Sequence, residues 1–124
     1  MTLHSFVPPS GRGGDGSAGG SAAPEVVAFH RTELGLILNV YGRAVAAGEW
    51  RDYSLDFLRD RAVFSIFRRA AENPIYRIEK RPREARRQGA FSVIGMDGRI
   101  LKRGHELRQV LRVLDAKLIR AIDE

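Results

Sequence analysis

The sequence contains no cysteine among its 124 residues. A disulfide framework, a thiol nucleophile and a thiolate metal site are therefore excluded. The three histidines stand far apart, and no HxxxH or HExxH spacing is present. A metal site needs several ligands at matched spacing, so we expect neither a metal nor any other cofactor.

Recognisable catalytic groups of other kinds are also missing. No serine lies in the GxSxG elbow that carries the nucleophile of many hydrolases. The carboxylates are scattered among arginines, whereas acid/base catalysis needs two groups that converge on one pocket. Such scattering is typical of surface ion pairs. We therefore predict no catalytic residue, and we do not expect an enzyme.

Long apolar runs are absent as well. No segment approaches the ~18 apolar residues that a membrane helix needs. The opening stretch, MTLHSFVPPSGRGG, has neither the basic start nor the apolar centre of a secretory signal. We expect a cytoplasmic protein with no membrane partner, and the lack of cysteine agrees with that compartment.

The chain has an excess of positive charge. Twenty-one Lys and Arg residues stand against 15 Asp and Glu, which gives a formal net charge of +6. The excess is uneven, because residues 68–87 contain eight Lys or Arg and only three acids. Such a segment can attract nucleic acid or an acidic protein surface, and it can also serve solubility alone.

Composition divides the chain into two parts. Residues 8–24, PPSGRGGDGSAGGSAAP, are mostly Gly, Ser, Ala and Pro and have too little apolar surface to offset the entropy of ordering. This run lacks the GK[S/T] ending of a phosphate loop. We predict a disordered tail over residues 1–24 and a single α+β domain over residues 25–124, which is long enough for one domain.

Hydrophobic periodicity predicts two helices with strands between them. We expect the first helix to be capped by Thr32 and to end at Gly48. The second helix is expected to start near His105. The apolar stripe of the first helix is Leu34, Ile37, Leu38, Tyr41 and Val45, and that of the second is Leu107, Val110, Leu111, Leu114, Leu118, Ala121 and Ile122.

Two-residue alternation at 53–57 and a run that is apolar on both faces at 62–67 predict the first two strands, and further strands are expected at 75–80, 90–95 and 99–102. Asp97-Gly98 indicates a two-residue type I′ turn between the last two. The stretch 25–30 could add a short strand. The predicted fold is α+β: an antiparallel four- to five-stranded meander, with the N-terminal and C-terminal helices packed on one face.

The segment between the third and fourth predicted strands is the most basic part of the chain. Residues 80–89 form a longer connection than the two to five residues that a simple hairpin needs. Arginine suits bidentate contact with phosphate. The stretch KRGHE at the mouth of the last helix adds two cations and His105 near helix N–H groups that could bind an anion. We favour a plain strand-to-helix turn, in which Gly104 supplies the backbone angle. The predicted nucleic-acid-binding residues are Arg81, Arg83, Arg86, Arg87, Lys102 and Arg103.

Aromatic residues offer a second place to look for a nucleic-acid contact. Trp50 and Tyr53 flank Arg51 and could stack on a base. They could equally fill the junction between the first helix and the sheet. We favour the core interpretation for both residues.

Several segments together resemble a family of small uncharacterised bacterial proteins that is catalogued as a domain of unknown function. The likeness covers about three quarters of the chain and leaves out the Gly-rich tail. It implies a short cytoplasmic protein without an assigned activity, and it carries over no site residues. The segments that carry it are YGRAVAAGEWRDY (41–53), DRAVFSIFRRA (60–70), IYRIEKRP (75–82), RRQGAFSV (86–93) and ILKRGHELRQVLRVLDAKL (100–118).

Two functions follow from the residues. The first is a non-enzymatic module that binds RNA or DNA through the basic segment. The alternative is a protein-interaction or homodimerisation module with no nucleic-acid role, whose partner is an acidic protein surface or a second copy. This alternative is suggested by the apolar run AVFSIF (62–67), which contains more apolar residues than one buried sheet face requires.

Overall fold

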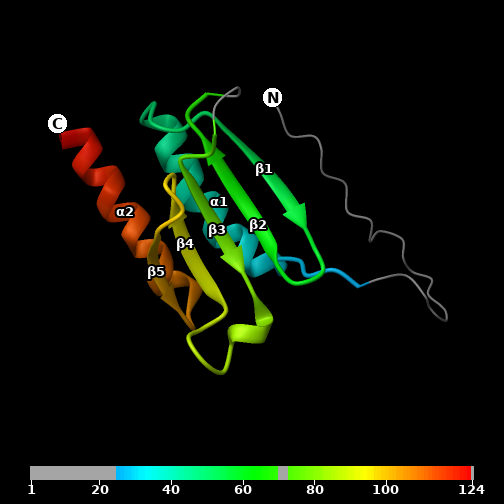
Figure 1. The fold of residues 1–124 in the computed structure, drawn as a ribbon. Helices are drawn as coiled ribbons and strands as arrows, with labels where there is room; N and C mark the ends of the chain where they lie inside the picture. Colours follow the sequence, from blue (N-terminus) through cyan, green and yellow to red (C-terminus); the bar gives the residue numbers. More distant parts are fainter. Residues whose placement is uncertain (1–24, 70–72, 124) are drawn as a thin grey trace.

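The structure is a computed structural model, and it describes residues 25–69 and 73–123 (Figure 1). Helix α1 (Arg31–Ala46) precedes five strands, and helix α2 (Leu107–Asp123) follows them. The strands form one antiparallel sheet in the order β1-β2-β3-β4-β5. The predicted α+β meander with a helix at each end is confirmed, while the predicted tail lies outside the described residues. The strands are β1 (Asp52–Phe57), β2 (Ala62–Phe67), β3 (Tyr76–Lys80), β4 (Phe91–Gly95) and β5 (Ile100–Gly104).

The core lies between the sheet and the two helices, which cover the same face (Figure 1). One row of paired residues crosses four strands and faces the helices, because side chains alternate between the two faces of a strand. This row is Leu55, Phe64, Ile78 and Val93. The helices contribute Ile37, Val40 and Ala44 from α1, and Leu107, Val110, Leu111, Leu114 and Leu118 from α2.

The first helix differs from its prediction at its start. Arg31 is its first residue, so Thr32 does not cap it. The Glu33 carboxylate instead accepts a hydrogen bond of 2.8 Å from the backbone N–H of His30. A carboxylate three residues into a helix satisfies an otherwise unpaired backbone donor in this way. The end of the helix agrees with the prediction, since Gly48 has a φ of +80°.

The face that α1 buries is also rotated from the predicted stripe. Ile37 is buried as expected, but Leu38 and Val45 are 37% and 40% exposed. Val40 and Ala44 lie in the core in their place. A wide apolar stripe leaves the centre of the buried face undetermined until a second helix packs beside it.

Residues 25–30 do not form the added strand that the sequence suggested. Phe29 inserts into the core, and the Nζ atom of Lys80 donates to the carbonyl of Ala28 at 2.9 Å. A single backbone hydrogen bond, from Val27 to Leu58, links this segment to the β1–β2 turn. The segment is therefore held by one anchor side chain and a few polar contacts.

The β4–β5 connection is one residue longer than the predicted two-residue turn. The backbone N–H of Gly95 bonds to the carbonyl of Arg99, which leaves the three residues 96–98 between them. Gly98 takes the positive φ, at +89°. A three-residue hairpin loop commonly ends in such a left-handed glycine.

Candidate nucleic-acid interface

The basic segment folds into a compact loop at one end of the sheet (Figure 1). The backbone N–H of Arg81 bonds to the carbonyl of Ala90 at 2.7 Å and closes the base of the loop. Pro82–Glu84 forms a short 3-10 helix, for which proline at the first position is well suited. The carbonyl of Glu84 then accepts hydrogen bonds from the backbone of residues 87–89. The loop is thus ordered by its own backbone.

The loop packs against the end of β5. Gly89 has a φ of +102°, and a Cβ atom added to it would lie 2.1 Å from the carbonyl carbon of Gly104. The guanidinium of Arg103 donates to the side-chain oxygen of Gln88. Pairing of Phe91 with Gly104 brings the start of β4 beside the end of β5. The loop and the KRGHE stretch are therefore neighbours in the fold.

This packing brings Arg103, which donates to Gln88, beside the three arginines of the loop, and we call these four residues the basic corner. Arg83, Arg86, Arg87 and Lys102 are exposed. Within residues 25–69 and 73–123, none of these four forms an ion pair with a carboxylate. The basic corner consists of Arg83, Arg86, Arg87 and Arg103. The sixth predicted residue, Lys102, pairs with the core residue Val93 and therefore lies on the opposite face of β5 from Arg103.

Arg81 has a different role from the one that the sequence suggested. Its Nε atom lies 3.1 Å from Oε1 of Glu79, and its Nη1 atom lies 3.3 Å from Oδ2 of Asp60. Two carboxylates therefore neutralise this guanidinium. Arg81 fixes the base of the loop to β3 and to the β1–β2 turn, and it is less free than the other five to contact a phosphate.

The residues that follow β5 add little to the basic corner. His105 is exposed where the chain passes from β5 to α2. Arg108 is exposed on the first turn of α2, and it lines a groove with Leu36 and Arg43 of α1. Gly104 does not take a positive φ, and a Cβ atom added to it would lie 3.3 Å from Cγ2 of Val110.

The aromatic residues do not offer a stacking surface. Trp50 is 5% exposed, as the core interpretation predicted. Tyr53 stacks on Phe64 with ring centroids 4.8 Å apart and planes 3° apart. Phe64 has no exposed surface. These rings contribute to the core and are not available to the bases of a bound strand.

The apolar residues of β2 form no exposed patch. Ala62, Phe64 and Ile66 face the core, and Val63 on the other face is only 6% exposed. Val63 lies between Asp56 and Glu79 of the neighbouring strands, whose longer side chains flank it. The structure therefore gives less reason than the sequence to expect a dimer or protein-interaction surface on β2.

Residues 25–69 and 73–123 contain no group of three or more His, Cys, Asp or Glu side chains able to hold a metal ion. Neither described helix is long and apolar enough to cross a membrane.

Comparison with known proteins places the chain in a family. No curated protein and no solved structure matches the chain. A family model described as "Protein of unknown function (DUF2794)" matches residues 27–111. The matched region includes α1, all five strands, the basic loop and the first turn of α2. Because the match covers more than half of the chain, this protein belongs to the DUF2794 family.

Proposed function

We propose that the protein binds nucleic acid through the basic corner and acts as a non-enzymatic binding module in the cytoplasm. One observation supports the proposal. Cations from two separate stretches of sequence lie together at one end of the sheet, and four of them have no carboxylate partner among the described residues. Cations that are not neutralised within the protein attract a polyanion.

The chemistry of the group suits phosphate. Arginine presents planar donors that match two phosphate oxygens, and all four residues of the basic corner are arginines. Contacts to phosphate position a protein without reading the bases. The proposal is therefore for binding with little dependence on nucleotide sequence.

The test is a titration of fluorescently labelled RNA and DNA with the full chain, followed by anisotropy at several salt concentrations. Replacement of Arg83, Arg86 and Arg87 by Gln should weaken binding at least tenfold at low salt. It should also reduce the slope of log K against log salt by about 2 to 3, since each phosphate contact contributes about 0.7 to 0.9. A matched control replaces Arg51, Arg99 and Arg120, which are exposed away from the basic corner.

Two results would contradict the proposal. One is the absence of any binding to RNA or DNA at low salt. The other is an equal loss of affinity in the loop variant and in the control variant, because that would indicate attraction by net charge alone. Sedimentation of the same samples addresses the alternative function, since a stable dimer or a bound acidic protein would indicate an interaction module.

A further inference from the structure

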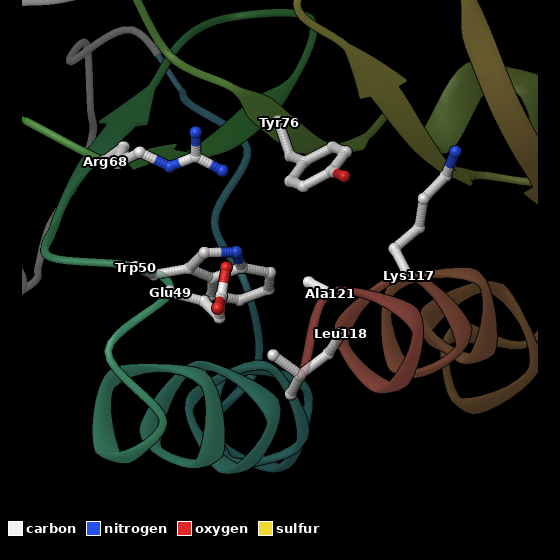
Figure 2. Close-up of a pocket in the computed structure, with 7 residues that line it drawn as sticks. All are labelled: Glu49, Trp50, Arg68, Tyr76, Lys117, Leu118 and Ala121. Carbon is white, nitrogen blue, oxygen red and sulfur yellow. The ribbon is translucent and has the colours of Figure 1, made fainter. Parts of the chain in front are cut away.

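At the end of the sheet opposite to the basic corner, a small pocket opens between the two helices and the sheet (Figure 2). Its volume is about 40 Å³, which is room for about three water molecules. Trp50 forms its floor beside the apolar side chains of α2, and Tyr76 of β3 closes the other side. Arg68, Lys117 and Glu49 are the charged residues that line it.

Trp50 brings an unpaired donor to this pocket. The side chain is 5% exposed, yet its indole N–H makes no hydrogen bond with any described residue. Figure 2 shows the indole nitrogen on the edge of the ring that faces Arg68 and Tyr76. The nitrogen is not among the fully buried side-chain atoms that lack a partner, so it keeps contact with solvent and can donate to an acceptor that enters the pocket.

Tyr76 supplies a second donor. Its hydroxyl makes no hydrogen bond within the described part of the chain. Burial raises the pKa of Tyr76, and the positive charge of Arg68 opposes that rise in part. The phenol therefore keeps its proton at neutral pH and can donate it in a hydrogen bond.

The charges of the lining favour an anion. Arg68 follows β2 and Lys117 belongs to α2, and both are exposed with no ion pair to a described carboxylate. Glu49 is the one carboxylate among the lining residues. The lining therefore contributes two cations and two neutral hydrogen-bond donors, but only one acidic side chain.

We propose that this pocket binds a small oxyanion, the phosphate or carboxylate group of a small molecule. Arg68 and Lys117 neutralise its charge from two sides, and the Trp50 N–H and the Tyr76 O–H donate to its oxygens. Glu49 at the rim limits the affinity for an anion. The pocket shares no residue with the basic corner, so anion binding there can be tested independently of nucleic-acid binding.

Trp50 is the single tryptophan of the chain, so its fluorescence reports directly on the pocket. The experiment titrates the full chain with inorganic phosphate and with acetate, at constant ionic strength maintained with chloride. We expect a saturable change in fluorescence with at least one of the two anions. The anion that saturates the fluorescence change at the lower concentration is the preferred oxyanion.

Variants test the assigned roles in opposite directions. Arg68→Gln and Lys117→Gln should each weaken binding about tenfold, as expected for the loss of a charge-assisted contact. Tyr76→Phe keeps the ring and should weaken it by a smaller factor. Glu49→Gln should strengthen it. The matched control, Arg59→Gln, removes an exposed charge outside the pocket and should change nothing.

The proposal is overturned if neither anion gives a saturable signal beyond that of chloride. It is also overturned if Arg68→Gln and Lys117→Gln bind as the unaltered chain does while their circular dichroism and melting temperature are unchanged. A variant of Arg83, Arg86 and Arg87 should keep full anion binding at the pocket. That variant separates a failure here from a failure of the proposed function.

Discussion

The guanidinium of Arg81 lies 3.1 Å from the carboxylate of Glu79, whose side chain is only 6% exposed on the sheet face away from the helices. No described helix or loop crosses that face (Figure 1). Nε of Arg61 approaches the same carboxylate at 4.0 Å, and it is buried without a hydrogen-bond partner among the described residues. The buried carboxylate of Glu79 and the more exposed carboxylate of Asp60 therefore balance two arginines at the base of the basic loop.

Replacement of Glu79 by Gln should destabilise the protein. The variant keeps the size of the side chain but removes the charge that balances Arg61 and Arg81. We expect the free energy of unfolding to fall by about 1 to 3 kcal/mol, measured by urea denaturation. Asp56→Asn, at an exposed position of β1, is the control and should stay within about 0.5 kcal/mol. Equal effects of the two changes would contradict the role assigned to Glu79.

Two ion pairs of similar length should differ in their contribution to stability. Nζ of Lys80 lies 2.8 Å from Glu33, and the two side chains are 12% and 17% exposed. Arg43 and Asp115 lie 2.6 Å apart but are 53% and 39% exposed. Lys80→Met should cost about 2 to 3 kcal/mol because it leaves a largely buried carboxylate unpaired. Arg43→Met should cost less than about 1 kcal/mol because solvent screens that pair. Thermal unfolding of both variants tests the order, which the reverse ranking would disprove.

Glycine to alanine changes should have opposite signs at two positions. At Gly89 the positive φ and the backbone of Gly104 leave no room for a Cβ atom, so we expect a loss of more than about 2 kcal/mol. At Gly42 nothing lies within 4 Å of the added atom, and the position is exposed in α1. Alanine there should stabilise the helix by about 0.5 to 1 kcal/mol. Denaturant melts give both values, and destabilisation at Gly42 would show that the glycine serves a close contact.

Stability should fall at alkaline pH in a way that depends on two tyrosines. Burial is the main cause that raises the pKa of Tyr41 and of Tyr76 above the usual value of 10.0. The native state therefore holds these protons more tightly than the unfolded state does. Their contribution is complete below about pH 10 and is lost as the pH rises through the native values. Denaturation from about pH 8 to about pH 11 should show this loss.

The double variant Tyr41→Phe, Tyr76→Phe isolates the effect from the titration of lysines. Its free energy of unfolding should depend less on pH above about 10 than that of the unaltered chain. Absorbance of ionised tyrosinate provides a second measurement. Identical pH profiles of the two proteins would disprove the tyrosine contribution.

The strands and their order were predictable because their signal is local. Tyr53, Leu55 and Phe57 alternate with polar residues, and short turns between successive strands favour an antiparallel meander. The start of α1 was mispredicted because Thr32 and the pair His30–Glu33 both offer suitable caps. The choice between them depends on where Phe29 enters the core.

The candidate interface was predictable as a set of residues but not as an arrangement. A count of charges cannot distinguish Arg81, which two carboxylates hold, from Arg83, which has no partner among the described residues. Asp60 is 21 positions from Arg81, and the β2–β3 pairing brings them together.

The amino-acid sequence by itself determined the order of helices and strands, the net positive charge and the lack of thiol chemistry. These properties depend on composition and on spacings of a few residues. Only the tertiary structure decided which cations have a carboxylate partner among the described residues, and that Trp50 and Tyr76 line one pocket. The physical reason is that ion pairs and pockets join residues tens of positions apart, and their distances follow from strand register and helix packing.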